Sequence, residues 1–123
     1  MDSGRDQSLC TATTGKSGFE ILEPIYEGIT AELIRRKIDV LIVDPFVSSH
    51  QVPENDNGAT DAVVKAWASV AEAANCSIML VHHTRKEGGA EVTAESARGG
   101  SAIVSAARDV RVLNRMQESE TSK

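Results

Sequence analysis

The stretch Ile38-Asp39-Val40-Leu41-Ile42-Val43-Asp44-Pro45 decides the fold of this chain. Five of its first six residues are Ile, Val or Leu. A short, continuous run of β-branched apolar residues is typical of a strand that is buried on both faces, as in a parallel sheet. Pro45 has no N–H to donate to a sheet ladder and therefore ends the strand. The stretch predicts a buried strand that carries Asp44 to the carboxyl-terminal edge of a sheet.

A second buried strand is predicted at residues 77–82, after a helix at about 59–74. Apolar residues at helical spacing indicate the helix, which Asp56 or Asn57 is placed to cap and Asn75 to stop. Strand, helix and strand form a βαβ unit, and such units are nearly always parallel and right-handed. The residues that end the second strand, His82-His83, therefore lie at the same sheet edge as Asp44.

An aspartate at such an edge has two interpretations. In open α/β sheets, ligands bind outside the carboxyl ends of the strands, and in nucleotide-hydrolysing proteins such an aspartate holds a magnesium ion, usually through water. The alternative is an aspartate that merely starts a turn. For the two histidines we expect one side chain to face the packing of the sheet and the other to face the site, since side chains alternate along a strand.

Further elements are predicted on both sides of the βαβ unit. Pro24 can occupy the first turn of a helix, and Ile25, Ile29 and Leu33 recur every four residues, which predicts an amphipathic helix. The predicted elements besides the βαβ unit are a hairpin from 9–13 and 19–22, this helix at 24–36, a short helix or tight turn at 99–107, a strand at 110–116 and a frayed tail at 117–123.

Gly15-Lys16-Ser17 resembles the end of a phosphate-binding loop, Gly-x-x-x-x-Gly-Lys-Ser/Thr, without completing it. The loop requires a glycine five positions before Gly15, where this chain has Cys10. It also requires a following helix, whereas Gly18 and a β-like run follow here. We therefore interpret Lys16 as a solvated lysine in a turn.

The composition is that of a soluble globular protein with one domain or part of one. The chain has 123 residues, of which 41% are hydrophobic and 25% are charged. A net charge of −5 excludes a generic polyanion binder, so any contact with nucleic acid must come from a local basic patch. Two widely spaced cysteines match no metal-ligand spacing, and no apolar run is long enough to span a membrane. We expect a cytoplasmic protein.

Four segments together resemble RecA-like ATPases of the RepA hexameric helicase type, which are often grouped as AAA-family ATPases. These segments are Asp39–Pro45, Glu54–Asn57, Val81–Lys86 and Arg98–Ser101, and the resemblance covers roughly residues 20–116. The resemblance implies an α/β fold: a partial RecA-like (P-loop NTPase) core with a mainly parallel sheet flanked by helices and a short N-terminal hairpin.

The resemblance also implies roles for matching residues. Asp44 resembles the Walker B aspartate, which positions Mg²⁺ through water, and His83 resembles the sensor histidine that contacts the terminal phosphate of ATP. Arg108 is similar to the arginine finger that reaches the nucleotide of a neighbouring subunit. Further contacts with phosphate or DNA are implied for Arg85, Lys86 and Arg98. The implied cofactors are ATP and Mg²⁺, and the implied partners are identical subunits in a hexamer and single-stranded DNA.

Two features of the family are absent from this sequence: the phosphate-binding loop and the catalytic glutamate that precedes the Walker B strand. We therefore expect residues 1–116 to be the C-terminal portion of a RecA-like ATPase domain that does not hydrolyse ATP alone, with residues 117–123 as a flexible tail. Helicase activity rests on analogy with the family.

Two other functions are compatible with the sequence. The first is a non-catalytic, degenerate RecA-like module that acts only by assembling with a partner. The second is a metal hydrolase that uses Asp44, His50, His82 and His83 as ligands. It ranks lower because adjacent histidines on a strand point to opposite faces and can rarely share one ion.

Overall fold

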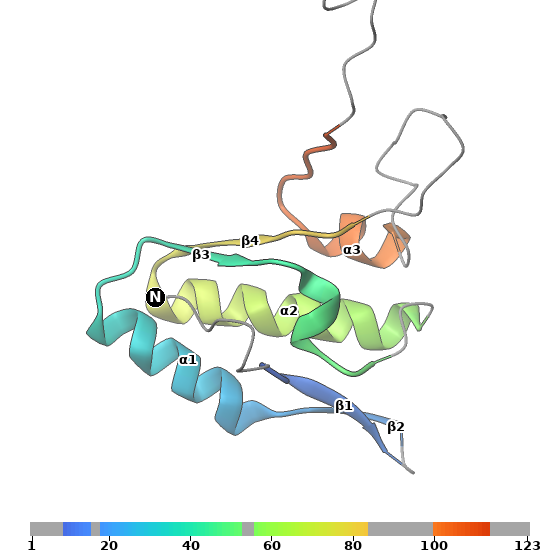
Figure 1. Ribbon diagram of the computed structural model, residues 1–123, viewed down its shortest axis with the longest axis horizontal. Helices are drawn as coiled ribbons and strands as arrows, with labels where there is room; N and C mark the ends of the chain where they lie inside the picture. Colours follow the sequence, from blue (N-terminus) through green and yellow to red (C-terminus); the bar gives the residue numbers. More distant parts are fainter. Residues whose placement is uncertain (1–8, 16–17, 53–55, 84–99, 114–123) are drawn as a thin grey trace, which may run out of the picture.

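The computed structural model describes residues 9–15, 18–52, 56–83 and 100–113. Within these ranges the chain forms two small sheets, with helices packed against them (Figure 1). In chain order the elements are β1 (Ala12–Gly15), β2 (Gly18–Ile21), α1 (Glu23–Arg35), β3 (Val40–Val43), the 3-10 helix η1 (Phe46–Ser49), α2 (Asn57–Ala74), β4 (Ser77–Leu80) and α3 (Gly100–Ala106).

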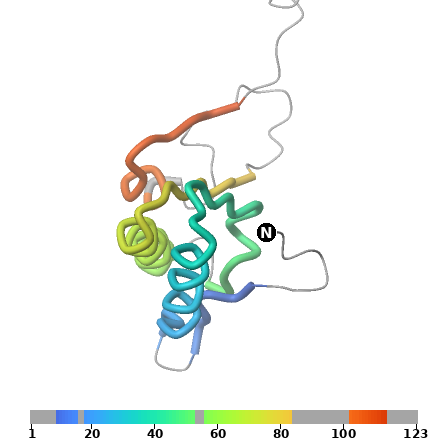
Figure 2. The backbone as a smooth tube through the Cα atoms, turned by 90° about the vertical axis from the view of Figure 1, so that its left-hand side faces the viewer, coloured from blue at the N-terminus to red at the C-terminus, as the bar shows by residue number. Residues whose placement is uncertain are grey.

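The predicted βαβ unit is confirmed. β3 and β4 pair in parallel, with Val40 opposite Ser77 and Val43 opposite Leu80, and α2 makes the crossover between them. Helices α1 and α2 lie side by side on the same side of this sheet (Figures 1 and 2). The two-stranded sheet and the two helices therefore form a two-layer α/β unit.

The prediction that the central strand is buried on both faces is wrong for the described part of the chain. Val43 is buried, and the other inward-facing apolar residues of β3 and β4 pack against the core. On the opposite face Val40, Ile42 and Met79 are 54%, 59% and 52% exposed. The physical reason is that α1 and α2 both cover one face, and no described element covers the other.

Both long helices end in the same kind of turn before a strand begins. After α1, Lys37 has φ 55°, and the N–H of Ile38 donates to the carbonyl of Leu33. After α2, Asn75 has φ 52°, and the N–H of Cys76 donates to the carbonyl of Ala71. This six-to-one hydrogen bond around a left-handed residue is the Schellman motif. Asn75 as the stop of α2 is confirmed.

The core is built mainly on α2. Val63, Trp67 and Val70 are 0%, 1% and 3% exposed, as their helical spacing predicts. The Tyr26 ring of α1 packs edge-on against the Trp67 ring, with ring centroids 5.2 Å apart. At the start of α2, the side chain of Asp56 accepts a hydrogen bond from the N–H of Ala59 at 3.0 Å. Asp56 rather than Asn57 is therefore the N-cap.

The predicted hairpin and the predicted C-terminal strand have different outcomes. β1 and β2 pair antiparallel, so the hairpin is confirmed, although β1 begins three residues later and β2 one residue earlier than expected. The strand predicted at 110–116 is wrong for residues 110–113, which lie outside any strand and leave the Leu113 side chain 91% exposed. Alternating apolar residues form a strand only where a partner strand offers hydrogen bonds. The predicted tail at 117–123 lies outside the described residues.

Candidate functional site

Asp44 and His83 meet at the carboxyl-terminal edge of the parallel sheet. Asp44 directly follows β3, and His83 lies three residues after the end of β4. The Nε2 atom of His83 is 3.3 Å from the Oδ1 atom of Asp44. The side chains are 70% and 56% exposed, respectively, so both can reach a ligand in solvent. The convergence that the βαβ pattern predicts is present in the structure.

Main-chain hydrogen bonds hold the two strand ends together beyond the last paired residues. The N–H of Val81 donates to the carbonyl of Val43 at 2.9 Å, and the N–H of Phe46 donates to the carbonyl of Val81 at 2.7 Å. The Asp44–Pro45 peptide bond lies between these two bonds and is cis. The backbone on both sides of Asp44 is therefore tied to the segment that carries His83.

A buried network of side chains supports η1, the element that follows Asp44-Pro45. The carbonyl of Ser49 accepts hydrogen bonds from the N–H and the Oγ1 of Thr11, at 2.8 and 2.9 Å. The hydroxyl of Tyr26 donates to the Oγ1 of Thr11 at 2.8 Å, and burial of the ring raises the Tyr26 pKa. These residues belong to no sequence motif and were not predicted to have a role. The one available signal was that Tyr26 is the only tyrosine in the chain.

His50 does not join the pair at the strand ends. His50 is only 7% exposed, and its ring packs edge-on against the Phe46 ring, with centroids 4.8 Å apart. Its Nδ1 atom accepts a hydrogen bond from the N–H of Val52. Among the described residues, no three His, Cys, Asp or Glu side chains gather closely enough to hold a metal ion. The ligand set of Asp44, His50, His82 and His83 is therefore not assembled.

Of the four basic residues predicted to contact nucleotide or DNA, only Arg108 lies within the described residues. Arg108 follows α3 and is exposed, while the adjacent Asp109 pairs with Arg111 at 3.2 Å. No hydrogen bond or ion pair joins Arg108 to Asp44 or His83. Arg85, Lys86 and Arg98 lie outside the described residues.

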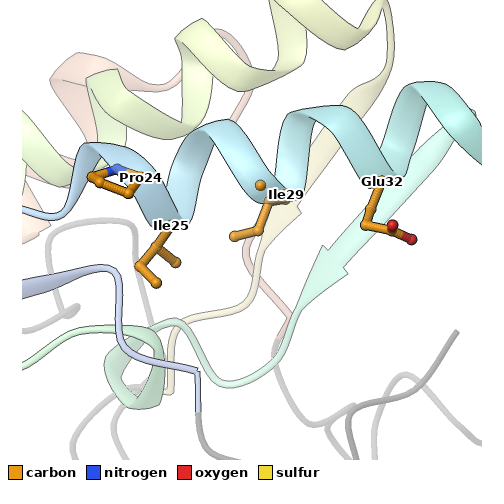
Figure 3. Close-up of a pocket in the computed structure, with 5 residues that line it drawn as sticks. Pro24, Ile25, Ile29 and Glu32 are labelled. Carbon is orange, nitrogen blue, oxygen red and sulfur yellow. The ribbon is translucent and has the colours of Figure 1, made fainter.

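A shallow groove of about 330 Å³ runs along α1, and its lining is largely apolar (Figure 3). Pro24, Ile25, Gly28, Ile29 and Glu32 line it. Hydrogen bonds from Arg35 and Arg36 lower the pKa of Glu32 to about 2, so the partners of this carboxylate are the last residue of α1 and the residue that follows it. Ligand sites combine apolar lining with a few polar groups that orient the ligand. This groove offers no such group, and we do not assign it a ligand.

Asp44 fits a magnesium ion and His83 fits a phosphate. Mg²⁺ takes oxygen ligands, keeps several waters and is commonly bound in proteins through one or two carboxylates together with phosphates of the substrate. The exposed carboxylate of Asp44 can supply one oxygen or hold a magnesium-bound water. The imidazole of His83 can donate a hydrogen bond to an anion beside that ion.

Two parallel strands joined by a helical crossover, with a carboxylate exposed at their carboxyl ends, define an α/β domain, and in such domains ligands generally bind at this edge of the sheet. A family model described as an AAA domain matches residues 2–89, well over half of the chain, and the chain belongs to this family. The match supports an ATPase-related domain of the P-loop type, for which nucleotide and metal binding are implied. It includes Asp44 and His83 but ends before Arg98 and Arg108.

Other comparisons add no further relative. No curated protein and no solved structure matches the chain. None of the helices in the described ranges has the length and apolar character that crossing a membrane requires.

Proposed function

We propose that this chain is the magnesium-binding and phosphate-sensing half of an ATP-hydrolysing motor similar to RepA-type DNA helicases. The contact between Asp44 and His83 at the carboxyl ends of two parallel strands is the observation that carries the proposal. A carboxylate for the metal and a donor for the phosphate need to lie within a few ångströms of each other, because the metal and the terminal phosphate of ATP are in contact.

Each residue has a distinct role in this proposal. Asp44 orients the water shell of Mg²⁺, which neutralises charge on the phosphate oxygens of the nucleotide. His83 donates a hydrogen bond to the terminal phosphate. Arg108 extends from the end of α3 to the nucleotide of a neighbouring identical subunit, where its guanidinium stabilises the charge of the transition state. DNA binding and a cytoplasmic location belong to the same proposal.

The chain is not expected to hydrolyse ATP alone. A phosphate-binding loop supplies backbone N–H groups and a lysine from a Gly-rich turn that opens a helix. The residues after Gly15-Lys16-Ser17 instead form β2, which begins at Gly18. The part of the chain around Lys16 therefore lacks the helix that such a loop requires.

The proposal is tested by adding Mn²⁺–ATP to the isotope-labelled chain and recording amide NMR spectra. Mn²⁺ replaces Mg²⁺ and broadens the signals of nearby nuclei. We expect broadening at Asp44, His83 and their neighbours, and its loss in Asp44→Asn. Asp39→Asn is the matched control, because Asp39 is an exposed aspartate that directly precedes β3, at the end opposite to Asp44. Equal broadening in both variants, or none in the parent chain, contradicts the magnesium role.

A second candidate function is a non-catalytic module that acts by assembly with a partner. The uncovered face of the β3–β4 sheet favours it, since a parallel sheet is normally covered on both faces. This module predicts no effect of Mn²⁺–ATP on Asp44, even when a loop-bearing partner is present.

A further inference from the structure

We propose that Thr11 and Ser49 are positioning residues for the site formed by Asp44 and His83. Both act through the backbone of η1, the short helix that directly follows Asp44-Pro45. This inference rests on the proposed function for what the site binds, and on the structure for how the site is held in place.

Asp44 and His83 depend on their backbone for their relative position. Their side chains are 56% and 70% exposed, so packing does not fix them. Within the described residues, the only side chain to which Asp44 is hydrogen-bonded is that of His83, at 3.3 Å. Binding sites keep their geometry when packing and hydrogen bonds behind them lock the residues that they present. The support for this pair therefore has to come from the segments that carry it.

A continuous series of hydrogen bonds leads from α1 to the end of β4. The hydroxyl of Tyr26 donates to the Oγ1 of Thr11 at 2.8 Å, and this Oγ1 donates to the carbonyl of Ser49 at 2.9 Å. The Oγ of Ser49 donates to the carbonyl of Phe46 at 2.7 Å. The N–H of Phe46 donates to the carbonyl of Val81, the residue directly after β4. The series therefore joins α1, the segment before β1, η1 and the second strand of the parallel sheet.

The network is buried, which makes it rigid. Thr11, Ser49 and Phe46 are 0%, 3% and 1% exposed, so water does not compete for their hydrogen bonds. A buried network whose members are satisfied restricts them to one arrangement. The N–H of Thr11 donates to the same carbonyl of Ser49, at 2.8 Å, so two donors hold this carbonyl. The end of η1 therefore has a fixed position relative to the segment before β1.

The chain transmits this position to Asp44. Asp44-Pro45 lies between two main-chain hydrogen bonds to Val81, and the N–H of Phe46 makes the second of them. The hydroxyl of Ser49 holds the carbonyl of the same Phe46. Loss of the Ser49 hydroxyl frees Phe46 on one side, and the backbone at Asp44 can then move away from the segment that carries its partner histidine.

The test is the NMR signature of the His83 imidazole in the isotope-labelled full chain, recorded at one pH without nucleotide. Asp44→Ala gives the reference for a lost contact between the two side chains. Thr11→Val replaces the hydroxyl by a methyl group of similar size, and we expect the ring nitrogen signals of His83 to shift toward their positions in Asp44→Ala. Thr11→Ser keeps the hydroxyl, so the His83 signals should stay at their positions in the parent chain.

Ser49→Ala is an independent variant, and Ser69→Ala is its matched control. Both remove a serine hydroxyl that donates to a main-chain carbonyl, but Ser69 is exposed on α2 and donates to Lys65. We expect the His83 signals to shift in Ser49→Ala alone. If Thr11→Val does not fold, Ser49→Ala decides the test. A loss of stability by itself does not shift the signals, because unfolding is slow and the folded and unfolded chains give separate signals.

Three results overturn the proposal. The first is unshifted His83 signals in Ser49→Ala, or in Thr11→Val if that variant folds. The second is an equally large shift in Thr11→Ser or Ser69→Ala, because the effect would then not depend on the buried hydroxyls. The third is identical His83 signals in the parent chain and in Asp44→Ala, because the contact that these residues position would then be absent.

The same variants separate this inference from the proposed function, because the His83 signals are recorded without nucleotide. If Mn²⁺–ATP has no effect on the parent chain, the magnesium role is refuted, while the shifts in Thr11→Val and Ser49→Ala still establish that these residues position the pair. If Mn²⁺–ATP broadens the signals at Asp44 but the His83 signals do not shift in the two variants, the positioning role alone is refuted.

Discussion

At the scale of single residues, the hydroxyl of Tyr26 has a structural role behind the candidate site. It donates to Thr11, and Thr11 in turn holds the carbonyl of Ser49 in η1. Tyr26→Phe keeps the ring that packs on Trp67 and removes only the hydroxyl. We expect a loss of about 1 kcal/mol in the free energy of unfolding, the usual net contribution of one buried hydrogen bond, measured by urea titration.

The control for Tyr26 is Thr14→Val, which removes an exposed and longer hydrogen bond of 3.4 Å to the carbonyl of Gln51. Thr14→Val should lower the free energy of unfolding clearly less than Tyr26→Phe does. Equal losses in the two variants would contradict the stabilising role of the buried network. Because burial raises the Tyr26 pKa above 10.0, the unfolded chain ionises first as the pH rises. The stabilisation by the hydroxyl is therefore present in full below pH 10.0 and declines above it. Above this pH the free energies of unfolding of the parent chain and of Tyr26→Phe should converge.

At the scale of elements, the two long helices stop by the same turn but with different residues at its left-handed position. Asn tolerates this conformation, whereas a lysine side chain there costs about 1–2 kcal/mol because its Cβ crowds the following carbonyl. Lys37, with φ 55°, carries this strain at the end of α1. We expect Lys37→Gly to stabilise the fold by about 0.5–1 kcal/mol, since the relief exceeds the entropic cost of glycine.

Urea titration measures the effect of Lys37→Gly, and Arg36→Gly is the control. Arg36 is the neighbouring exposed residue in an ordinary helical conformation with φ −90°, so glycine there should destabilise. If both changes raise the free energy of unfolding, or if neither does, backbone strain at Lys37 does not lower the stability of the fold.

At the scale of the whole molecule, the sequence predicts what is local and periodic. The alternation of strand, helix and strand places Asp44 and His83 at one edge. Helix chemistry limits the N-cap of α2 to Asp56 or Asn57, and the structure uses Asp56. The uncovered sheet face could not be predicted, because an apolar strand has the same composition whether or not another element covers it. The failed strand at 110–113 has a related cause, since alternation does not reveal whether a partner strand is within reach.

The uncovered face makes a prediction about the stability of the isolated chain. Ile42 and Val43 are neighbours on β3, but Ile42 is 59% exposed and Val43 is 8% exposed. Threonine keeps the β-branched shape that favours a strand, so the substitution mainly tests burial. We expect Ile42→Thr to change the free energy of unfolding by no more than about 0.5 kcal/mol, as for other exposed positions.

Val43→Thr should cost about 1–3 kcal/mol in the same urea titration, because it buries a hydroxyl within the core. Similar large losses at both positions would mean that the face carrying Ile42 is covered in the free chain. The non-catalytic module would then lose the observation that favours it. A large loss at Val43 alone means that β3 contributes its inward face to the folding of this chain, and that its outward face remains available for a partner.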